Sequence, residues 1–119
     1  MAEAYLYHIT TGSAWQAAQQ EGIYRPESLA TQGFIHLSTA DQVYRVANAV
    51  YHSVPDLLLL TIQAAGLGDA LRYEAPDPTL PTQTADTELF PHLYSALPLS
   101  AVAAVQALIP KADGSFSAD

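Results

Sequence analysis

The feature that most constrains the fold is a continuous apolar run, LLLLTI, at residues 57 to 62. Pro55 and Asp56 precede the run and Gly66 follows it, so a turn is expected on each side. The run is far shorter than the roughly 20 residues that cross a bilayer. A short apolar run between turn signals is typical of a strand that is buried on both faces. The sequence therefore predicts a central strand with covering structure on either side.

Capping signals predict two short helices. Ser13 begins a capping-box spacing, which favours a helix over residues 14–21. Thr39 and Gln42 form a second such spacing. Valine and alanine then recur at positions i, i+3, i+4 and i+7, the stripe of an amphipathic helix, which predicts a second helix over residues 41–52.

The remaining segments predict further strands, connections and a tail. Strands are expected at residues 5–10, 34–39 and 70–74, and the segment around Pro91 is expected to be extended, either at a sheet edge or as an irregular strand. Residues 100–108, SAVAAVQAL, fit either a helix or a turn at 99–101 followed by a strand at 102–108. Residues 23–33 are predicted to be a connecting segment, residues 75–87 an exposed loop, and residues 110–119 a disordered tail. The expected fold is α+β: a single mixed-sheet domain spanning residues 1–109, with two short helices.

Composition limits the possible functions. Half of the 119 residues are hydrophobic, which is enough for one compact core. Without cysteine, the chain can form no disulfide, thiolate metal site or cysteine nucleophile. The formal net charge of −8 repels nucleic acid and anionic membranes, although local donors or one helix N-terminus could still hold a small anionic cofactor. The N-terminus has no signal-peptide pattern, so we expect a cytoplasmic protein. The oligomeric state stays open.

Histidine occurs with other polar residues in three segments, YLYHITTG, FIHLSTA and ELFPHLYS. Side chains alternate between the two faces of a strand, so the polar residues of each segment should share a face. The pairs expected on one face are His8 with Thr10, His36 with Ser38, Glu88 with His92, and Arg72 with Glu74. This pattern predicts a polar cleft. Each residue could instead have a structural role, as a hydrogen-bonded histidine or a surface ion pair.

The segments YHIT, GFIHLSTADQV, RYE and LFPHLY, in this order, resemble a bacterial family known as domain of unknown function 952. The resemblance extends from about residue 5 to about residue 108. The family has no established activity to carry over to this chain.

A more distant resemblance is to the ADP-ribosyltransferase fold, and in particular to its tRNA 2′-phosphotransferase branch. His8 and Thr10 match a His-Gly-Thr strand of that branch, and His36 and Ser38 match its His-x-His-Leu-Ser strand. Ile9 replaces the glycine of the first motif. The arginines expected to bind RNA phosphate are missing, which argues against removal of an RNA 2′-phosphate.

This second resemblance implies that NAD or a related nucleotide binds as co-substrate. Cleaving the bond between nicotinamide and ribose develops an oxocarbenium ion, which a carboxylate would stabilise. Glu88 is the first candidate for this carboxylate and Glu74 the second, with His36 as a candidate general base. The candidate cofactor-binding residues are His8, Thr10, Ser38, Tyr24 and His92, and Tyr44 and Tyr51 are alternatives to Tyr24 for stacking on the nicotinamide.

Two other classes of function remain open from the sequence. One is a non-catalytic domain that binds a small ligand or a protein partner in the same cleft. The other is a metal site formed by His8, His36, His92 and Glu88, although no close histidine spacing supports it.

Overall fold

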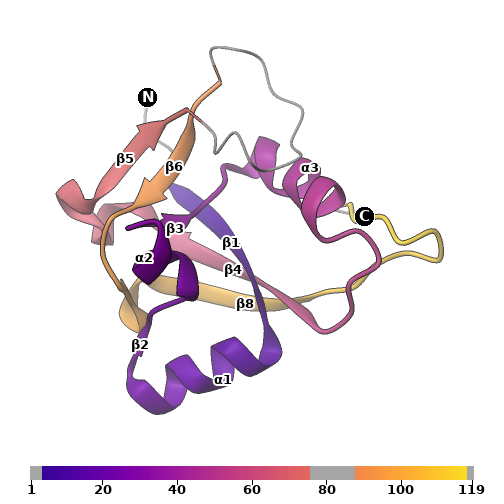
Figure 1. The fold of residues 1–119 in the computed structure, drawn as a ribbon, viewed down its shortest axis with the longest axis horizontal. Helices are drawn as coiled ribbons and strands as arrows, with labels where there is room; N and C mark the ends of the chain where they lie inside the picture. The colour runs from indigo at the N-terminus through magenta and orange to yellow at the C-terminus, as the bar shows by residue number, and fades with distance from the viewer. Residues whose placement is uncertain (1–3, 76–87, 118–119) are drawn as a thin grey trace.

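The apolar run forms strand β4 (Leu57–Gln63), the middle strand of an antiparallel sheet between β1 (Tyr5–Thr11) and β8 (Val102–Leu108). Figure 1 shows this sheet in the computed structural model, which describes residues 4–75 and 88–117. Leu60 and Ile62 on one face are completely buried, and Leu57 and Leu59 on the other face are 2% and 5% exposed, which confirms the prediction of a central strand covered on both faces.

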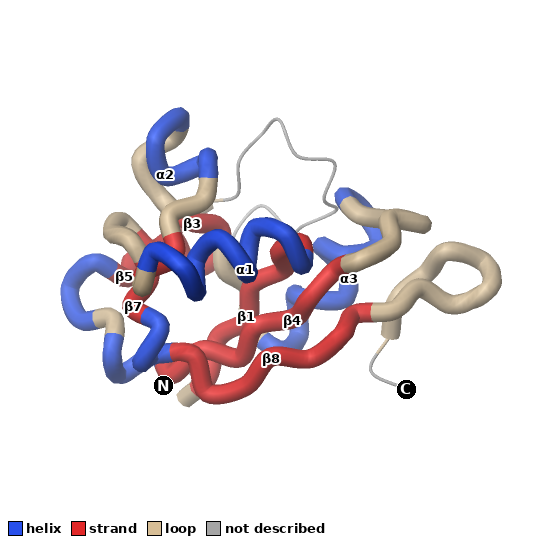
Figure 2. The backbone as a smooth tube through the Cα atoms, turned by 90° about the horizontal axis from the view of Figure 1, so that it is seen from below, coloured by secondary structure: helices blue, strands red, loops and turns tan. Residues whose placement is uncertain are grey.

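Helices α1 (Gly12–Glu21) and α3 (Ala40–Val50) cover opposite faces of this sheet, and Figure 2 shows α1 lying over the strands. Each helix contributes a small buried residue, Ala18 from α1 and Ala47 from α3, to its own apolar cluster. The sheet contributes Leu6, Leu60 and Ile62 to the first cluster and Ile9, Leu57 and Leu59 to the second. The α+β class follows from this layering.

Both helices begin at side-chain caps. The prediction for α3 is confirmed, because the backbone N–H of Thr39 donates to Oε1 of Gln42 at 3.0 Å within a capping box. Helix α1 begins earlier than predicted. Its N-cap is Thr11, whose hydroxyl accepts from the backbone N–H of Ala14 at 3.1 Å, so Ser13 lies inside the first turn.

A third helix, α2 (Glu27–Thr31), forms in the segment that was expected to be a connection. Among the residues that the structure describes, the prediction of two helices is therefore corrected to three. Pro26 precedes the helix with φ fixed near the required value, and Glu27 places a carboxylate in its first turn. Gly33 follows it with a φ of +90°, a left-handed conformation that favours glycine. Just before α2, strand β2 (Ile23–Tyr24) pairs with β7 (Leu97–Pro98).

A second three-stranded sheet has the order β3 (Ile35–His36), β6 (Phe90–Leu93), β5 (Leu71–Glu74). Of the two arrangements predicted for the segment around Pro91, the sheet edge is wrong, since β6 is the middle strand. Leu37 donates its N–H to the carbonyl of Pro91 at 3.0 Å, but proline has no N–H to donate in return. Strand β3 is short for this reason. Every strand pairing among the described residues is antiparallel.

A single antiparallel bridge joins the two larger sheets. The N–H of Tyr7 donates to the carbonyl of Ser38, and the N–H of Ser38 donates to the carbonyl of Tyr7, both at 2.8 Å. The bridge lays the two segments side by side, so the side chain of His8 reaches the backbone carbonyl of His36.

The chain after β8 folds back onto the domain. Phe116 is only 3% exposed and belongs to the second apolar cluster. Its N–H donates to Oδ1 of Asn48 at 2.7 Å and its carbonyl accepts from Nδ2 of the same side chain at 3.0 Å. The expected disordered tail at 110–119 therefore differs from the structure over residues 110–117. The expected loop at 75–87 lies outside the described residues, apart from residue 75.

The last ambiguous segment is settled as a 3-10 turn over Leu99–Ala101 followed by β8. Among the helices of residues 4–75 and 88–117, none has the length and apolar character needed to cross a membrane.

Candidate functional site

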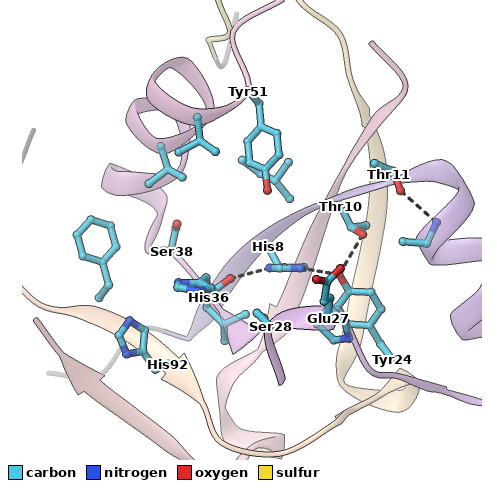
Figure 3. Close-up of a pocket in the computed structure, with 17 residues that line it drawn as sticks. His8, Thr10, Thr11, Tyr24, Glu27, Ser28, His36, Ser38, Tyr51 and His92 are labelled. Atoms are coloured by element: carbon cyan, nitrogen blue, oxygen red, sulfur yellow. Dashed lines mark hydrogen bonds between the residues drawn. The ribbon is translucent and has the colours of Figure 1, made fainter. Parts of the chain in front are cut away.

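A cavity of about 500 Å³ opens where β1, the segment after β3 and β6 come together, between α2 and the C-terminal end of α3 (Figure 3). All the residues predicted for the site line this cavity, except the two carboxylates. The polar residues that line it are His8, Thr10, Thr11, Tyr24, Glu27, Ser28, His36, Ser38, Tyr51 and His92. The apolar residues that line it are Ile9, Ala14, Pro26, Leu37, Val46, Val50 and Phe90.

His8 is held at both ring nitrogens by protein groups. Its Nδ1 lies 2.6 Å from the carbonyl oxygen of His36, and its Nε2 lies 2.7 Å from the hydroxyl of Tyr24. A carbonyl oxygen only accepts, so Nδ1 carries the proton and donates it. Nε2 of the neutral ring then accepts from Tyr24. His8 is therefore fixed in one tautomer and one orientation.

Tyr24 continues this chain of hydrogen bonds toward Thr10, whose hydroxyl lies 3.0 Å away. The tyrosine has one proton and gives it to His8, so the hydroxyl of Thr10 donates to the phenolic oxygen. Figure 3 shows the resulting line of contacts from Thr10 to the carbonyl of His36. The sequence predicts that His8, Thr10 and Tyr24 bind one ligand. In the structure these three side chains already form one hydrogen-bond network.

Burial shifts the acid–base behaviour of this network. Desolvation lowers the pKa of His8 to about 4, against a weaker opposing effect of the hydrogen bond to His36. Desolvation also raises the pKa of Tyr24 to about 12, while the hydrogen bond from Thr10 acts in the other direction. At neutral pH His8 is uncharged and Tyr24 keeps its proton. Neither group is suited to exchanging a proton with a ligand.

His36 and Ser38 share the face of the second sheet that meets the cavity. Nε2 of His36 lies 2.7 Å from Oε1 of Gln32, which as an amide oxygen accepts, so Nε2 donates. Ser38 is only 6% exposed and lines the cavity. The structure thus brings His36 and Ser38 to the same cavity as His8, together with Ile9 and Leu37, which alternation placed on the opposite faces.

His92 lies directly opposite His36 in the pairing of β3 with β6. It is 3% exposed, and its Nδ1 lies 2.9 Å from Oε1 of Glu74 on β5. The same carboxylate oxygen accepts from the hydroxyl of Tyr94 at 2.5 Å. These hydrogen bonds, first from Tyr94 and then from His92, lower the pKa of Glu74. Glu74 therefore reaches the cavity only through His92.

Glu88 is engaged away from the cavity. Its Oε2 accepts from Nε2 of Gln42 at 3.0 Å and forms an ion pair with Arg45 of α3. Neither Glu88 nor Arg45 lines the cavity. The structure therefore does not bring the first-choice carboxylate to the other predicted site residues.

Several cavity residues were not predicted from the sequence. Glu27 and Ser28 line the cavity from the start of α2, in the segment that was expected to be a connection. A proline followed by an acidic residue is a helix-start signal, so this turn was detectable. Of the alternative tyrosines, Tyr51 lines the cavity and Tyr44 does not.

The hypothesis of a metal site finds no support in the geometry. Within residues 4–75 and 88–117, no group of three or more histidine, cysteine, aspartate or glutamate side chains could hold a metal ion. Both nitrogens of His8 already have protein partners, and Glu88 is paired with Arg45.

The family model described as "Protein of unknown function (DUF952)" matches residues 9–105. The chain belongs to this family. The first of the two resemblances seen in the sequence is therefore confirmed. No match is found among curated proteins.

The solved structures of one relative share the fold over nearly the whole chain. The crystal structure of protein CC0527 from Caulobacter crescentus is 31% identical, with a TM-score of 0.80 over 95% of this chain and 93% of that one. The solution NMR structure of CC0527 is 30% identical, with a TM-score of 0.78 over 97% and 93% of the two chains. Their descriptions name no ligand or activity, so a function for this chain must be argued from its cavity.

Proposed function

We propose that the protein binds NAD or a closely related nucleotide, with the nicotinamide riboside half enclosed in the cavity. The observation that carries the proposal is the convergence of His8, Thr10, Tyr24, His36, Ser38 and His92, from separate segments, on one cavity of about 500 Å³. The resemblance to the ADP-ribosyltransferase fold rests on four of these residues and suggests the ligand class. Fold resemblance alone does not establish function, so the cavity must support the choice.

The charges around the cavity favour the nicotinamide riboside half over the diphosphate. No arginine or lysine of the described residues lines the cavity, and the formal net charge of the chain is −8. A diphosphate enclosed there would have no cation beside it. The nicotinamide ring of NAD carries a positive charge, and Glu27 and the ring of Tyr51 both line the cavity. The diphosphate and adenosine are therefore expected to lie outside it.

Hydrogen bonding in the cavity suits a ribose and an amide. Ser38 and Ser28 offer hydroxyl groups that both donate and accept, while the apolar residues Val50 and Phe90 can contact the faces of a ring. His8 would hold the network that shapes the cavity rather than exchange a proton. The enzymatic form of the proposal is transfer or hydrolysis at the bond between nicotinamide and ribose.

A non-catalytic ligand-binding domain is the second candidate. The specific observation in its favour is that Glu88 and Glu74 do not line the cavity. Among the described residues, Glu27 is the acidic residue that lines it. Binding of NAD without release of nicotinamide would distinguish this candidate from an enzyme.

The test is calorimetric titration with NAD, nicotinamide riboside and ADP-ribose, together with thermal unfolding. We expect NAD and nicotinamide riboside to bind with affinities within about tenfold of each other, a difference of about 1.4 kcal/mol, and ADP-ribose to bind much more weakly. Ser28→Phe should abolish binding by filling the cavity. Ala30→Phe, on the exposed side of the same helix, is the matched control and should leave binding unchanged. Absence of heat and of thermal stabilisation with all three compounds would refute the proposal.

A further inference from the structure

The three histidines of the cavity differ in which ring nitrogen remains for a ligand. His8 uses both nitrogens within the protein, and Nε2 of His36 is engaged by Gln32. The hydrogen bonding of His92 within the described chain involves Nδ1, which leaves Nε2. His92 is therefore a histidine whose Nε2 lone pair can meet a bound molecule.

Glu74 determines which nitrogen of His92 carries the proton. An ionised carboxylate only accepts, so the 2.9 Å contact requires a proton on Nδ1, and the lone pair of the neutral ring lies on Nε2. Glu74 is kept ionised by the hydrogen bond from Tyr94, and the guanidinium of Arg72 lies 5.1 Å from the centre of the Tyr94 ring. The carboxylate fixes the tautomer.

The order of the strands places His92 between Glu74 and the cavity residue His36 of β3. Strand β5, with Glu74, lies on one side of β6, and β3 lies on the other. Nδ1 of His92 is occupied by Glu74, and the ring itself lines the cavity next to His36, its pairing partner on β3.

Aromatic packing holds the plane of the ring. Phe34 stacks on His92 with ring centres 4.1 Å apart and planes inclined by 18°, and His36 meets the ring edge-on at 5.7 Å. A ring that is buried, stacked and hydrogen-bonded at one nitrogen loses little freedom when it acts on a ligand. A carboxylate that orients a histidine in this way is the arrangement by which proteins prepare a general base.

We propose that His92 is the general base of the cavity and that Glu74 is the residue that positions it. The inference rests on the proposed binding of NAD. A water molecule attacks the anomeric carbon of the nicotinamide riboside, and the bond from that carbon to the ring nitrogen breaks, with its electron pair leaving on neutral nicotinamide. Nε2 of His92 takes the proton of the water, and the hydroxyl group stays on the ribose. The imidazolium is stabilised by the carboxylate of Glu74.

The experiment measures release of nicotinamide from NAD by chromatography, with NAD binding measured by calorimetry on the same samples. We expect His92→Gln to lower kcat about 100-fold or more with KM little changed, and Glu74→Gln to lower it about 10-fold to 100-fold. His52→Gln, an exposed histidine away from the cavity, is the matched control and should keep the wild-type rate.

A second measurement does not depend on activity. Nitrogen NMR of the imidazoles should show His92 of the wild-type protein with its proton on Nδ1, and Glu74→Gln should weaken this preference. Since Glu74 is partly exposed, its variant should fold even if substitution of the buried His92 does not.

Each outcome bears on one proposal. Binding of NAD without nicotinamide release by the wild-type protein overturns the general base and leaves the binding proposal intact. Release that is unaffected by both substitutions, or a proton on Nε2 instead of Nδ1, also overturns it. Absence of NAD binding refutes the proposed function, and the general base falls with it.

Discussion

His8 and His92 line the same cavity but have opposite hydrogen-bonding surroundings. His8 donates to a backbone carbonyl and accepts from Tyr24, so both of its ring nitrogens are hydrogen-bonded to protein groups. His92 donates to Glu74 and keeps Nε2 for a ligand. A histidine that lines a cavity is therefore a candidate for chemistry only when its protein partners leave a ring nitrogen unused. Three predictions test this contrast.

The largest expected effect is on folding stability when His8 is removed. His8→Ala leaves the carbonyl of His36 without its partner and opens a void beside Tyr24, so we expect the free energy of unfolding to fall by about 3 kcal/mol. His92→Gln should cost only about 1 kcal/mol, because its partner Glu74 remains hydrated and paired with Tyr94. Urea unfolding followed by circular dichroism measures both values.

Tyr24→Phe is the matched control for this prediction, because it removes only the hydroxyl that donates to His8. A loss of about 1 kcal/mol is expected. Equal destabilisation by His8→Ala and His92→Gln would contradict the contrast between a structural and a functional histidine.

The next effect is the dependence of stability on pH. The pKa of His8 falls from an ordinary 6.5 to about 4 on folding. Above pH 6.5 both states are neutral and the stability is complete. As the pH falls from 6.5 toward 4, the unfolded chain binds a proton that the folded chain does not, so stability declines, by on the order of 2 kcal/mol for a ring that faces a cavity.

Urea unfolding at intervals between pH 7 and pH 4.5 measures this decline. Glu74 does not contribute in that range, because a carboxylate with a lowered pKa loses its stabilising effect only below its ordinary value of 4.5. His8→Ala should therefore flatten the curve in this window. A wild-type curve that is already flat would show that His8 is not held neutral.

The smallest effect concerns Phe34, which stacks on His92 and does not contact the hydrogen bonds of His8. Phe34→Leu should lower the free energy of unfolding by roughly 0.5–1 kcal/mol, the value of an aromatic pair. If the stacked ring orients a general base, nicotinamide release should fall more than NAD binding does. A matched decrease in both, or none in either, would indicate that Phe34 only packs.

The local elements were largely predictable from the sequence. Thr39 and Gln42 identify the start of α3, and the alternation in FIHLST places His36 and Ser38 on one face. Both rules depend on neighbouring residues alone, since a cap spans one turn and a strand alternates at every residue. The resemblance to the family was also visible in short motifs.

Other features were misread because their cause lies elsewhere in the chain. Residues 110–117 are polar and rich in turn residues, yet Phe116 is held by Asn48 and by the second apolar cluster. Pro91 lies in a middle strand although it has no N–H to donate to Leu37. Its carbonyl still accepts from the N–H of Leu37, and on the other side it pairs with Tyr73. In both cases the local structure depends on residues that are far away in the sequence.

The central strand, the main helices and the residue types that line the cavity could be predicted from the sequence, because they follow from periodicity and capping. Only the tertiary structure decided which partner each polar group receives. In the folded chain Glu88 pairs with Arg45 and Glu74 pairs with His92. Both ring nitrogens of His8 are hydrogen-bonded within the protein. The physical reason is that hydrogen bonds and ion pairs act over a few ångströms, so the chemistry of a histidine depends on segments that the chain brings together only when it folds.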